Sequence, residues 1–165
     1  MGTRSRYGLL TLTVASALAL CGAASAAVVQ SATGSGMFIQ FLNGGEFSRT
    51  FAFTAQTRAD GTTTGQAELV NRFSGARIHI AIDCLSVALT TATMSGTITH
   101  SNNPNFPVGL GAVFSVTDNG EGANSPPDTV SLVSFDIPSP AFACTSFAVP
   151  PPFVPITGGN VQVRP

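Results

Sequence analysis

The densest group of polar side chains lies in residues 118–122, which read Asp-Asn-Gly-Glu-Gly, and another acid, Asp128, follows shortly afterwards. Carboxylate and amide oxygens in a glycine-rich loop are the ligands that calcium takes in extracellular proteins. One interpretation is therefore a calcium site with four ligands: Asp118, Asn119, Glu121 and Asp128. The favoured interpretation is a plain turn, because Asn and Gly tolerate a positive φ and turn chemistry already explains every feature of the stretch. Its spacing differs from that of a helix-loop-helix calcium loop, and no other cofactor is expected.

A second group of chemistry-bearing residues lies where two neighbouring strands are expected. Side chains alternate along a strand, so Glu68, Arg77, His79 and Asp83 are predicted to share one face of the hairpin. Carboxylates beside an imidazole can act as general acid and base. The alternative is a solvated face whose charges pair across the strands. Since the chain has neither a Gly-x-Ser-x-Gly motif nor a phosphate-binding glycine loop, we expect no catalytic residues and a non-enzymatic protein.

The chain holds three cysteines, and two of them, Cys84 and Cys144, are expected in its folded part. A cysteine pair in an exported chain is more often a disulfide than a metal site. Zinc would need His79 and His100 as well, and neither Cys-x-x-Cys nor His-x-x-x-His occurs. We therefore predict a Cys84–Cys144 disulfide, which closes a loop of about 60 residues and stabilises the fold by ~4 kcal/mol.

Export itself is predicted from residues 1–26. They combine a basic start, an apolar run from Leu9 to Leu20 and small residues up to Ala26, which is the pattern of a signal peptide. The apolar run is shorter than the ~20 residues that a membrane-spanning helix needs. We expect a signal helix that is cleaved after Ala26, a single domain over residues 27–165, and a secreted, extracellular or periplasmic protein. The alternative is lipidation at Cys21, although Leu20 replaces the small residue of a lipoprotein box.

The charge of the expected mature domain limits its partners. It contains five arginines, no lysine and eight acidic residues, a net charge of −3. A weakly acidic surface with scattered arginines argues against nucleic acid and against anionic membranes. No segment after the signal is long enough to span a membrane. The composition does not identify the partner; a protein and a component of the cell envelope are the candidates.

Short runs of β-branched and aromatic residues, separated by turn residues, extend through the whole mature chain. No sustained period of 3.6 residues occurs outside the signal. We therefore predict an all-β domain, an antiparallel sandwich or small barrel of about eight strands. The expected strands are 37–42, 49–57, 63–70, 76–87, 92–100, 112–117, 129–135 and 160–164.

The hairpin formed by residues 63–70 and 76–87 can be predicted in detail. Its second strand alternates, so that Ile78, Ile80, Ile82 and Cys84 share the apolar face. Matching apolar faces sets Leu69 against Ile78 or Ile80 and places Glu68 across from His79 or Arg77. Cys84 is then expected to point inward. Further along, residues 137–155 contain six prolines and are predicted to be a surface loop, since proline cannot donate to a sheet ladder.

Several segments resemble a family of small secreted bacterial proteins without an assigned function. The family usually has Gly-Asn where this chain has Leu89-Thr90. The resemblance implies an exported β-domain and transfers no catalytic residue. The residues that carry it are Gly65-Gln66-Ala67, Ile82-Asp83-Cys84-Leu85-Ser86-Val87, Ala92-Thr93-Met94-Ser95-Gly96-Thr97-Ile98, Phe114-Ser115-Val116-Thr117-Asp118-Asn119-Gly120-Glu121-Gly122, Pro127-Asp128, Cys144 and Ile156-Thr157-Gly158-Gly159-Asn160-Val161-Gln162-Val163.

Three functions remain open from the sequence. The first is a secreted, non-enzymatic binding or structural module. The second is a lipocalin-like barrel that holds a small apolar ligand, because all twelve phenylalanines lie in the mature part and could line a cavity as well as fill a core. The third is an enzyme without a recognisable motif. A cavity inside the fold favours the barrel, and a filled core favours the module.

Overall fold

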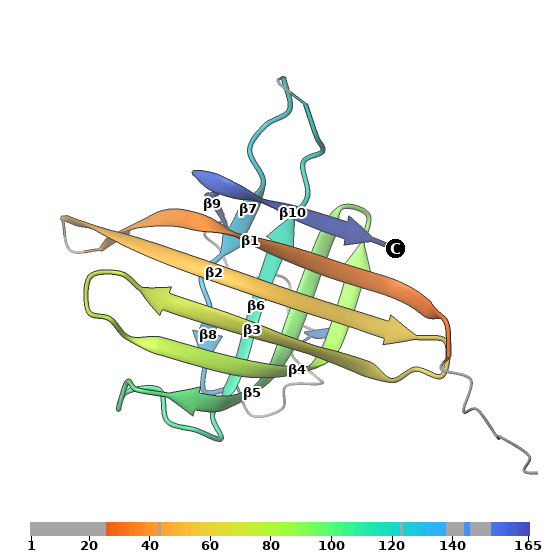
Figure 1. The fold of residues 1–165 in the computed structure, drawn as a ribbon, viewed down its shortest axis with the longest axis horizontal. Helices are drawn as coiled ribbons and strands as arrows, with labels where there is room; N and C mark the ends of the chain where they lie inside the picture. The colour runs from red at the N-terminus through yellow and green to blue at the C-terminus, as the bar shows by residue number, and fades with distance from the viewer. Residues whose placement is uncertain (1–25, 43, 123, 138–143, 146–152) are drawn as a thin grey trace, which may run out of the picture.

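The computed structural model describes residues 26–42, 44–122, 124–137, 144–145 and 153–165. Residues 1–25, which hold Cys21 and almost all of the expected signal peptide, lie outside this part of the chain. The described residues form the ten strands labelled in Figure 1, and the all-β prediction is confirmed. The strands are β1 (Val28–Leu42), β2 (Gly45–Arg58), β3 (Thr63–Asn71), β4 (Arg77–Ala88), β5 (Thr91–Ser101), β6 (Gly111–Thr117), β7 (Thr129–Ser131), β8 (Ser134–Phe135), β9 (Phe153–Pro155) and β10 (Gly158–Arg164).

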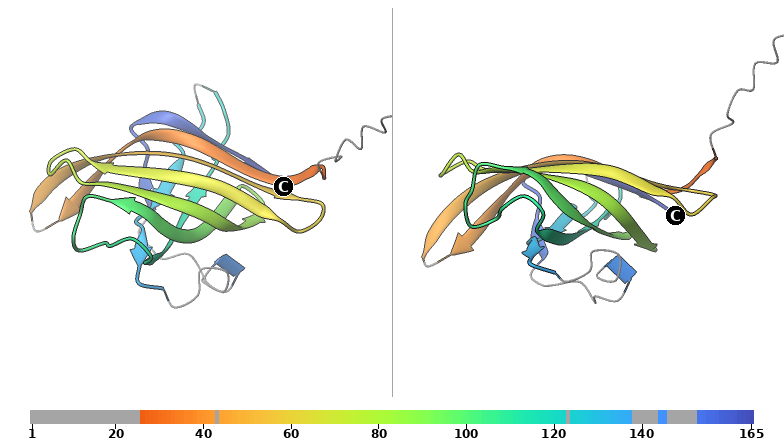
Figure 2. Two further views of the ribbon diagram at one scale, coloured as in Figure 1. Left: turned by 60° about the horizontal axis from the view of Figure 1, so that its bottom comes forward. Right: turned by 90° about the horizontal axis from the view of Figure 1, so that it is seen from below.

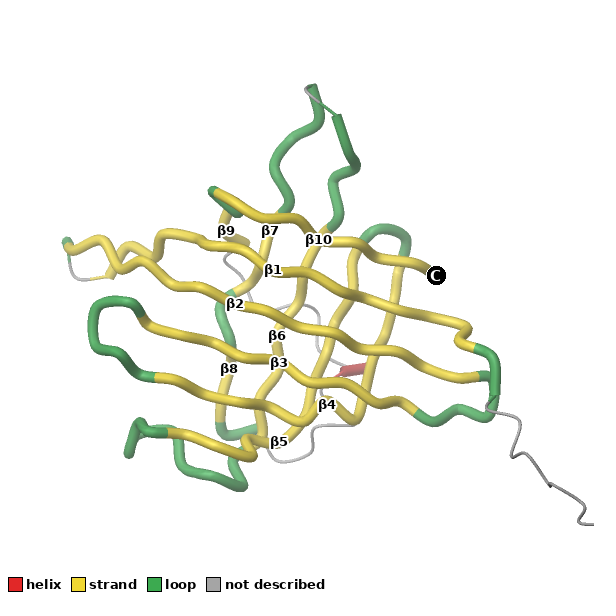
Figure 3. The backbone as a smooth tube through the Cα atoms, in the orientation of Figure 1, coloured by secondary structure: helices red, strands yellow, loops and turns green. Residues whose placement is uncertain are grey.

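All of these strands belong to one antiparallel sheet. Nine of them follow the order β10-β1-β2-β3-β4-β5-β6-β7-β9, and β8 pairs with β6 beside this path. The sheet arches over strongly, as the two rotated views of Figure 2 show, and forms a half-barrel with a concave inner face. Figure 3 shows that strands make up most of the described chain and that turns and loops join them. The architecture is thus a single curled sheet.

The inner face holds the hydrophobic core. Four aromatic rings form a chain through it: the ring centroids of Phe38 and Phe51 are 6.1 Å apart, those of Phe51 and Phe53 6.0 Å, and those of Phe53 and Phe114 5.9 Å. Their strands place them there because alternate residues of a strand face the same side. These phenylalanines therefore fill the core, as one of the two interpretations of the aromatic content predicted.

Strand β1 is much longer than the expected strand 37–42. Its early part contains Gly34 and Gly36, which weaken a strand pattern in a sequence. In the structure these glycines lie directly opposite Phe53 and Phe51 of β2. A Cβ atom on Gly34 would lie only 3.0 Å from the Phe53 ring, and one on Gly36 would lie 3.3 Å from the Phe51 ring. The rings cover the glycines, so the strand is stabilised by packing that sequence periodicity does not reveal.

The hairpin of β3 and β4 has the predicted register. Leu69 pairs with Ile78, and Glu68 pairs with His79. Ile78 is buried on the core side, whereas His79 is partly exposed on the other side. The apolar and polar faces of this hairpin are therefore assigned correctly by the period-2 pattern.

The inward direction predicted for Cys84 is wrong. The register of β4 against β5 shifts between Ile82 and Cys84, so one extra residue, Asp83, lies in β4 at that point. Such a bulge reverses the alternation. Ile82 and Leu85 are buried in the core, and Cys84 lies on the opposite face of the sheet.

The predicted Cys84–Cys144 disulfide is confirmed, and it lies on that opposite face. Cys144 is buried, and its Sγ lies 3.5 Å from the carbonyl oxygen of Thr93 on β5. The Thr93 and Ser115 hydroxyl groups, also buried there, are joined by a hydrogen bond of 2.8 Å. The disulfide therefore lies against the outer side of β5, whose Thr93 and Ser95 are buried there.

The last two strands bring opposite ends of the strand order together. β9 pairs with β7 at one end, β10 pairs with β1 at the other, and only Ile156 and Thr157 connect them. The predicted loop 137–155 therefore ends in a strand; residues 138–143 and 146–152 of it lie outside the described residues. Pro155 is tolerated in β9 because β9 is an edge strand of the sheet. The expected strand 129–135 is split into β7 and β8.

The turn between β4 and β5 holds a residue in an unusual backbone conformation. Leu89 has a φ of 55° and is almost fully exposed. This left-handed conformation favours glycine. The turn is therefore formed in spite of the side chain at this position.

Candidate functional site

A pocket of about 260 Å³ lies against the inner face of the half-barrel. This equals the volume that roughly nine water molecules occupy in the liquid, so the space suits a small ligand. Strands β1 to β4 form one wall, and the segments that follow β5 and β7 form the other. The lining residues are Phe38, Gln40, Arg49, Leu69, Asn71, Ala76, Ile78, Asn103, Phe106, Leu132, Val133 and Phe135.

Most of the pocket wall is apolar. Phe38 and Ile78, which are buried, belong to the core and form the inner part of the wall. Phe106 and Phe135 stack on each other with ring centroids 4.1 Å apart. Because Phe106 follows β5 and Phe135 ends β8, this stack ties two segments together beside the pocket. The pocket therefore has the apolar, pre-formed wall that is typical of small-molecule sites.

One cationic side chain lines the pocket. Arg49 of β2 lies directly between Phe38 of β1 and Asn71 of β3 in the cross-strand register. Its Nε donates a hydrogen bond of 2.5 Å to Oε1 of Gln40. Burial lowers the pKa of the Arg49 guanidinium, which nevertheless stays protonated at physiological pH because an arginine starts so far above it. The pocket thus contains a fixed positive charge.

Two asparagines add hydrogen-bond donors to the same pocket. Oδ1 of Asn71 accepts from the backbone N–H groups of Phe73 and Ser74, and Oδ1 of Asn103 accepts from that of Asn105. Each amide is therefore oriented by its own turn. In the described part of the chain, the Nδ2 atom of neither asparagine donates a hydrogen bond. The polar groups of the pocket can thus offer donors to a ligand.

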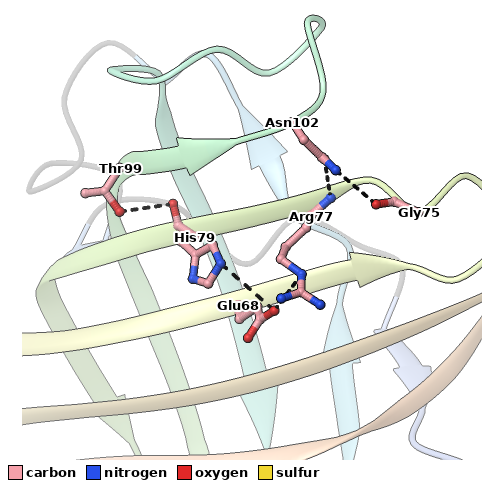
Figure 4. Close-up of polar contacts among 6 residues, drawn as sticks. All are labelled: Glu68, Gly75, Arg77, His79, Thr99 and Asn102. Carbon is pink, nitrogen blue, oxygen red and sulfur yellow. Dashed lines mark hydrogen bonds and ion pairs between the residues drawn. The ribbon is translucent and has the colours of Figure 1, made fainter.

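The predicted row of charged residues lies on the outer face of β3 and β4, as Figure 4 shows. Glu68 Oε1 is 3.1 Å from Arg77 Nε and 4.0 Å from His79 Nε2. His79 also meets His100 of β5, with ring centroids 5.6 Å apart. Asn102 supports the end of this strand by accepting from the Arg77 backbone N–H at 2.6 Å. The structure brings three of the four predicted residues together.

The main interaction in the outer row is a cross-strand ion pair between Glu68 and Arg77, whose side chains are partly exposed to solvent. The 4.0 Å separation of Glu68 from His79 is too long for a hydrogen bond. Asp83 lies further along β4 at the bulge, where burial raises the pKa of its carboxyl group. Because Glu68 and Leu69 are consecutive on β3, the row and the pocket lie on opposite faces of the sheet.

The predicted calcium residues lie between β6 and β7, beside residues 160–163 of β10. Asp128 is buried, and each of its carboxylate oxygens accepts one backbone N–H: Oδ1 from Asn119 at 2.9 Å and Oδ2 from Val161 at 2.8 Å. Asp118 accepts from Gly120 at 2.9 Å and from Val163 at 3.1 Å. The two aspartates therefore bond the N–H groups of β10, a strand at the end of the sheet.

The other two predicted ligands extend the same connection. Asn119 donates from Nδ2 to the Pro127 carbonyl at 2.7 Å. Glu121 Oε1 accepts from the side-chain amides of Asn160 and Gln162, at 3.3 and 3.2 Å. We call the four residues Asp118, Asn119, Glu121 and Asp128 the seam residues: three of them join the β6–β7 loop to β10, and Asn119 bonds Asp128 and Pro127 within the loop. Within the described residues, no group of three or more His, Cys, Asp or Glu side chains is placed to hold a metal ion. The calcium site stays a prediction.

We compared the chain with models of known protein families, with curated proteins and with solved structures, and none of them matches. In the described part, no helix is long and apolar enough to cross a membrane. The site must therefore be interpreted from its own geometry.

Sequence reasoning offered a Phe-lined cavity as an alternative, but it missed the arginine in the pocket and the pocket's second wall. The signal was present in β2, where Arg49 has the same alternation phase as Phe51 and Phe53. A charged residue on the apolar side of a strand marks either the rim of the core or a binding site. The second wall, with Phe106 and Phe135, could not be found this way because it comes from segments that only the tertiary fold brings together.

Proposed function

We propose that this protein is exported and binds a small, mainly apolar molecule in the pocket on the inner face of the half-barrel. The observation that carries the proposal is the pocket itself: about 260 Å³ of space with a largely aromatic and aliphatic wall on a curved sheet. Concave, pre-formed, mostly apolar cavities with a few polar groups are where proteins hold small ligands. This is the lipocalin-like alternative of the sequence interpretation, now favoured over a purely structural module.

Two features support export. The first 26 residues have the pattern of a signal peptide, and Cys84 is joined to Cys144. Disulfides form and persist in oxidising compartments and are rare in the cytosol. We infer a secreted or periplasmic location, in which a binding protein would meet its ligand outside the cytoplasm.

The placement of the titratable groups argues for binding rather than catalysis in this pocket. Glu68 and His79, the acid–base candidates, lie on the outer face of the sheet, whereas the pocket is lined from the inner face. A general acid or base must come within hydrogen-bond reach of the reacting atoms. These two groups therefore cannot act on a molecule in the pocket.

The proposal is tested by titrating the ¹⁵N-labelled protein with octan-1-ol and following its amide resonances. At about 0.5 kcal/mol for each of its roughly nine non-hydrogen atoms, we expect a Kd on the order of 0.5 mM. The shifts should centre on Phe38, Ile78 and Phe106. Shifts confined to exposed apolar residues such as Phe41 and Phe73, or no shifts at all, would contradict the proposal.

Three variants make the test specific. Ala76→Phe puts a ring into the pocket and should abolish octanol binding, whereas Ala81→Phe, on the exposed outer face of β4, should leave it unchanged. Phe106→Ala enlarges the pocket and should shift the preference from octanol to longer alcohols. Equal effects of Ala76→Phe and Ala81→Phe would show that binding takes place elsewhere.

A further inference from the structure

We propose that the ligand of this pocket is a small amphipathic carboxylate, whose charged end binds the Arg49 guanidinium and whose apolar part lies against Phe38, Phe106 and Phe135. This inference rests on the proposed function and adds the chemical class of the ligand. It follows from the charge of the pocket, from the hydrogen-bonding groups that line it and from its size.

The charge of Arg49 has no counter-ion in the described residues. The two ion pairs found there both involve Glu68, on the outer face. Arg49 has one neutral partner, the Gln40 amide oxygen, which takes the Nε–H. A guanidinium carries five N–H donors, so its two terminal nitrogens remain available. A half-buried charge is costly unless it is paired, and an anion in the pocket would supply that pair.

The neutral polar groups of the pocket favour an acceptor as well. Asn71 and Asn103 use their Oδ1 atoms for backbone N–H groups of their own turns, which leaves their Nδ2 groups as donors. Gln40 likewise uses Oε1 for Arg49. These three lining residues can thus offer donors to the space, so a ligand that brings only acceptors is complementary to them. A carboxylate has this property, since it accepts at both oxygens and donates at none.

The number of positive charges in the pocket favours a carboxylate over a phosphate as the ligand's charged group. Among the described residues, Arg49 is the single Lys or Arg that lines the pocket, so the site offers one positive charge. A carboxylate carries one negative charge and matches a guanidinium through two parallel hydrogen bonds. A phosphate monoester carries nearly two charges at neutral pH and would bring one of them into the pocket unpaired. The volume then limits the apolar part to a short chain or a single ring.

The test compares three ligands of equal chain length: octanoate, octan-1-ol and octylammonium. Isothermal titration of the protein at pH 7 should give octanoate a Kd about tenfold lower than that of octanol, since one charged hydrogen-bonded pair is added. Octylammonium should bind more weakly than octanol. Equal affinities for octanoate and octanol would overturn the carboxylate inference and leave the apolar pocket standing, whereas failure of all three ligands would overturn the proposed function.

Two variants locate the effect. Arg49→Gln keeps a polar side chain and removes the charge; it should retain octanol binding and lose the preference for octanoate. Arg77→Gln, on the outer face, should keep that preference, and a loss in both variants would mean that overall charge rather than the pocket is responsible. Lowering the pH on the unaltered protein gives an independent check that needs no variant. Protonation of the ligand carboxyl near pH 4 to 5 should bring octanoate to the affinity of octanol, and a preference that persists at pH 3.5 would contradict the proposal.

Discussion

Two groups of acidic side chains in this protein differ in burial and in hydrogen-bond partners, although both are candidate sites in the sequence. At the seam between the β6–β7 loop and β10, Asp128 is buried and bonds two backbone N–H groups. On the outer face of β3 and β4, Glu68 remains in contact with solvent and bonds the side chain of Arg77. The same chemical group is thus structural in one place and a surface charge in the other.

The buried aspartates lie at an edge of the sheet. β10 is an edge strand, and the N–H groups on its free side would otherwise be open to pairing with another chain. Asp118 and Asp128 bond the Val163 and Val161 N–H groups and so complete the edge with side chains. Glu68 has no such task, because β3 lies between two neighbouring strands whose backbone bonds are already made.

The largest effect is expected for Asp128→Ala. The substitution removes two hydrogen bonds to a charged group and leaves the Val161 N–H buried without its acceptor, so the free energy of unfolding should fall by about 3 kcal/mol. Urea titration followed by circular dichroism measures it. Glu121→Ala, in the same loop but exposed, should cost less than about 0.5 kcal/mol. Similar losses for both variants would mean that the seam does not depend on the buried carboxylate.

A much smaller effect is expected on the outer face. A double-mutant cycle with Glu68→Ala and Arg77→Ala should give a coupling energy of no more than about 0.5 kcal/mol, because solvent screens exposed pairs. In 1 M NaCl the coupling should disappear. A coupling near that of a buried pair, about 3 kcal/mol, would remove the distinction between the two groups.

Local patterns explain how far the sequence could be interpreted. Runs of β-branched and aromatic residues predict the all-β class. Alternation limits the partner of Leu69 to Ile78 or Ile80 and predicts the outer position of Glu68, because both depend only on period 2 within one hairpin. The Cys84–Cys144 disulfide follows from cysteine number and the expected compartment. The direction of Cys84 fails for a local reason as well, since a single extra residue at Asp83 reverses the alternation and no residue type announces it.

What the sequence could not provide depends on distant segments. The β1 glycines are covered by rings from β2, and the second wall of the pocket comes from residues after β5 and β7. The partners of Asp118 and Asp128 on β10 are more than 30 residues away along the chain. The polar cluster was therefore found, but its role as a set of ligands or as a cap on a strand edge could not be decided from spacing.

Asp83, at the bulge in β4, is an intermediate case. Its carboxylate neither accepts two main-chain N–H groups of other residues, as Asp128 does, nor forms an ion pair, as Glu68 does, within the described residues. Burial raises the pKa of Asp83 above its unfolded value, so the folded protein binds the proton more tightly. Its contribution to stability is therefore complete at low pH and is lost as the pH rises through the folded pKa. Asp83→Asn should match the original protein below pH 3 and exceed its stability by about 0.3 kcal/mol at pH 7, since the side chain is largely exposed. Greater stability of the original protein at pH 7 would reverse the sign.

The last prediction concerns whether the seam carboxylates bind calcium in addition to the β10 backbone. Both oxygens of Asp118 and of Asp128 already accept backbone N–H groups, whereas calcium takes six to eight oxygen ligands. We expect the melting temperature in 10 mM CaCl₂ and in EDTA to agree within about 1 °C. An extracellular site with a Kd near 1 mM would instead add about 1.4 kcal/mol at that concentration, or roughly 4 °C. A shift of that size that is lost in Asp118→Asn would establish the calcium site. The hydrogen bonds from Asp118 and Asp128 to the β10 backbone would then be a second role of calcium ligands.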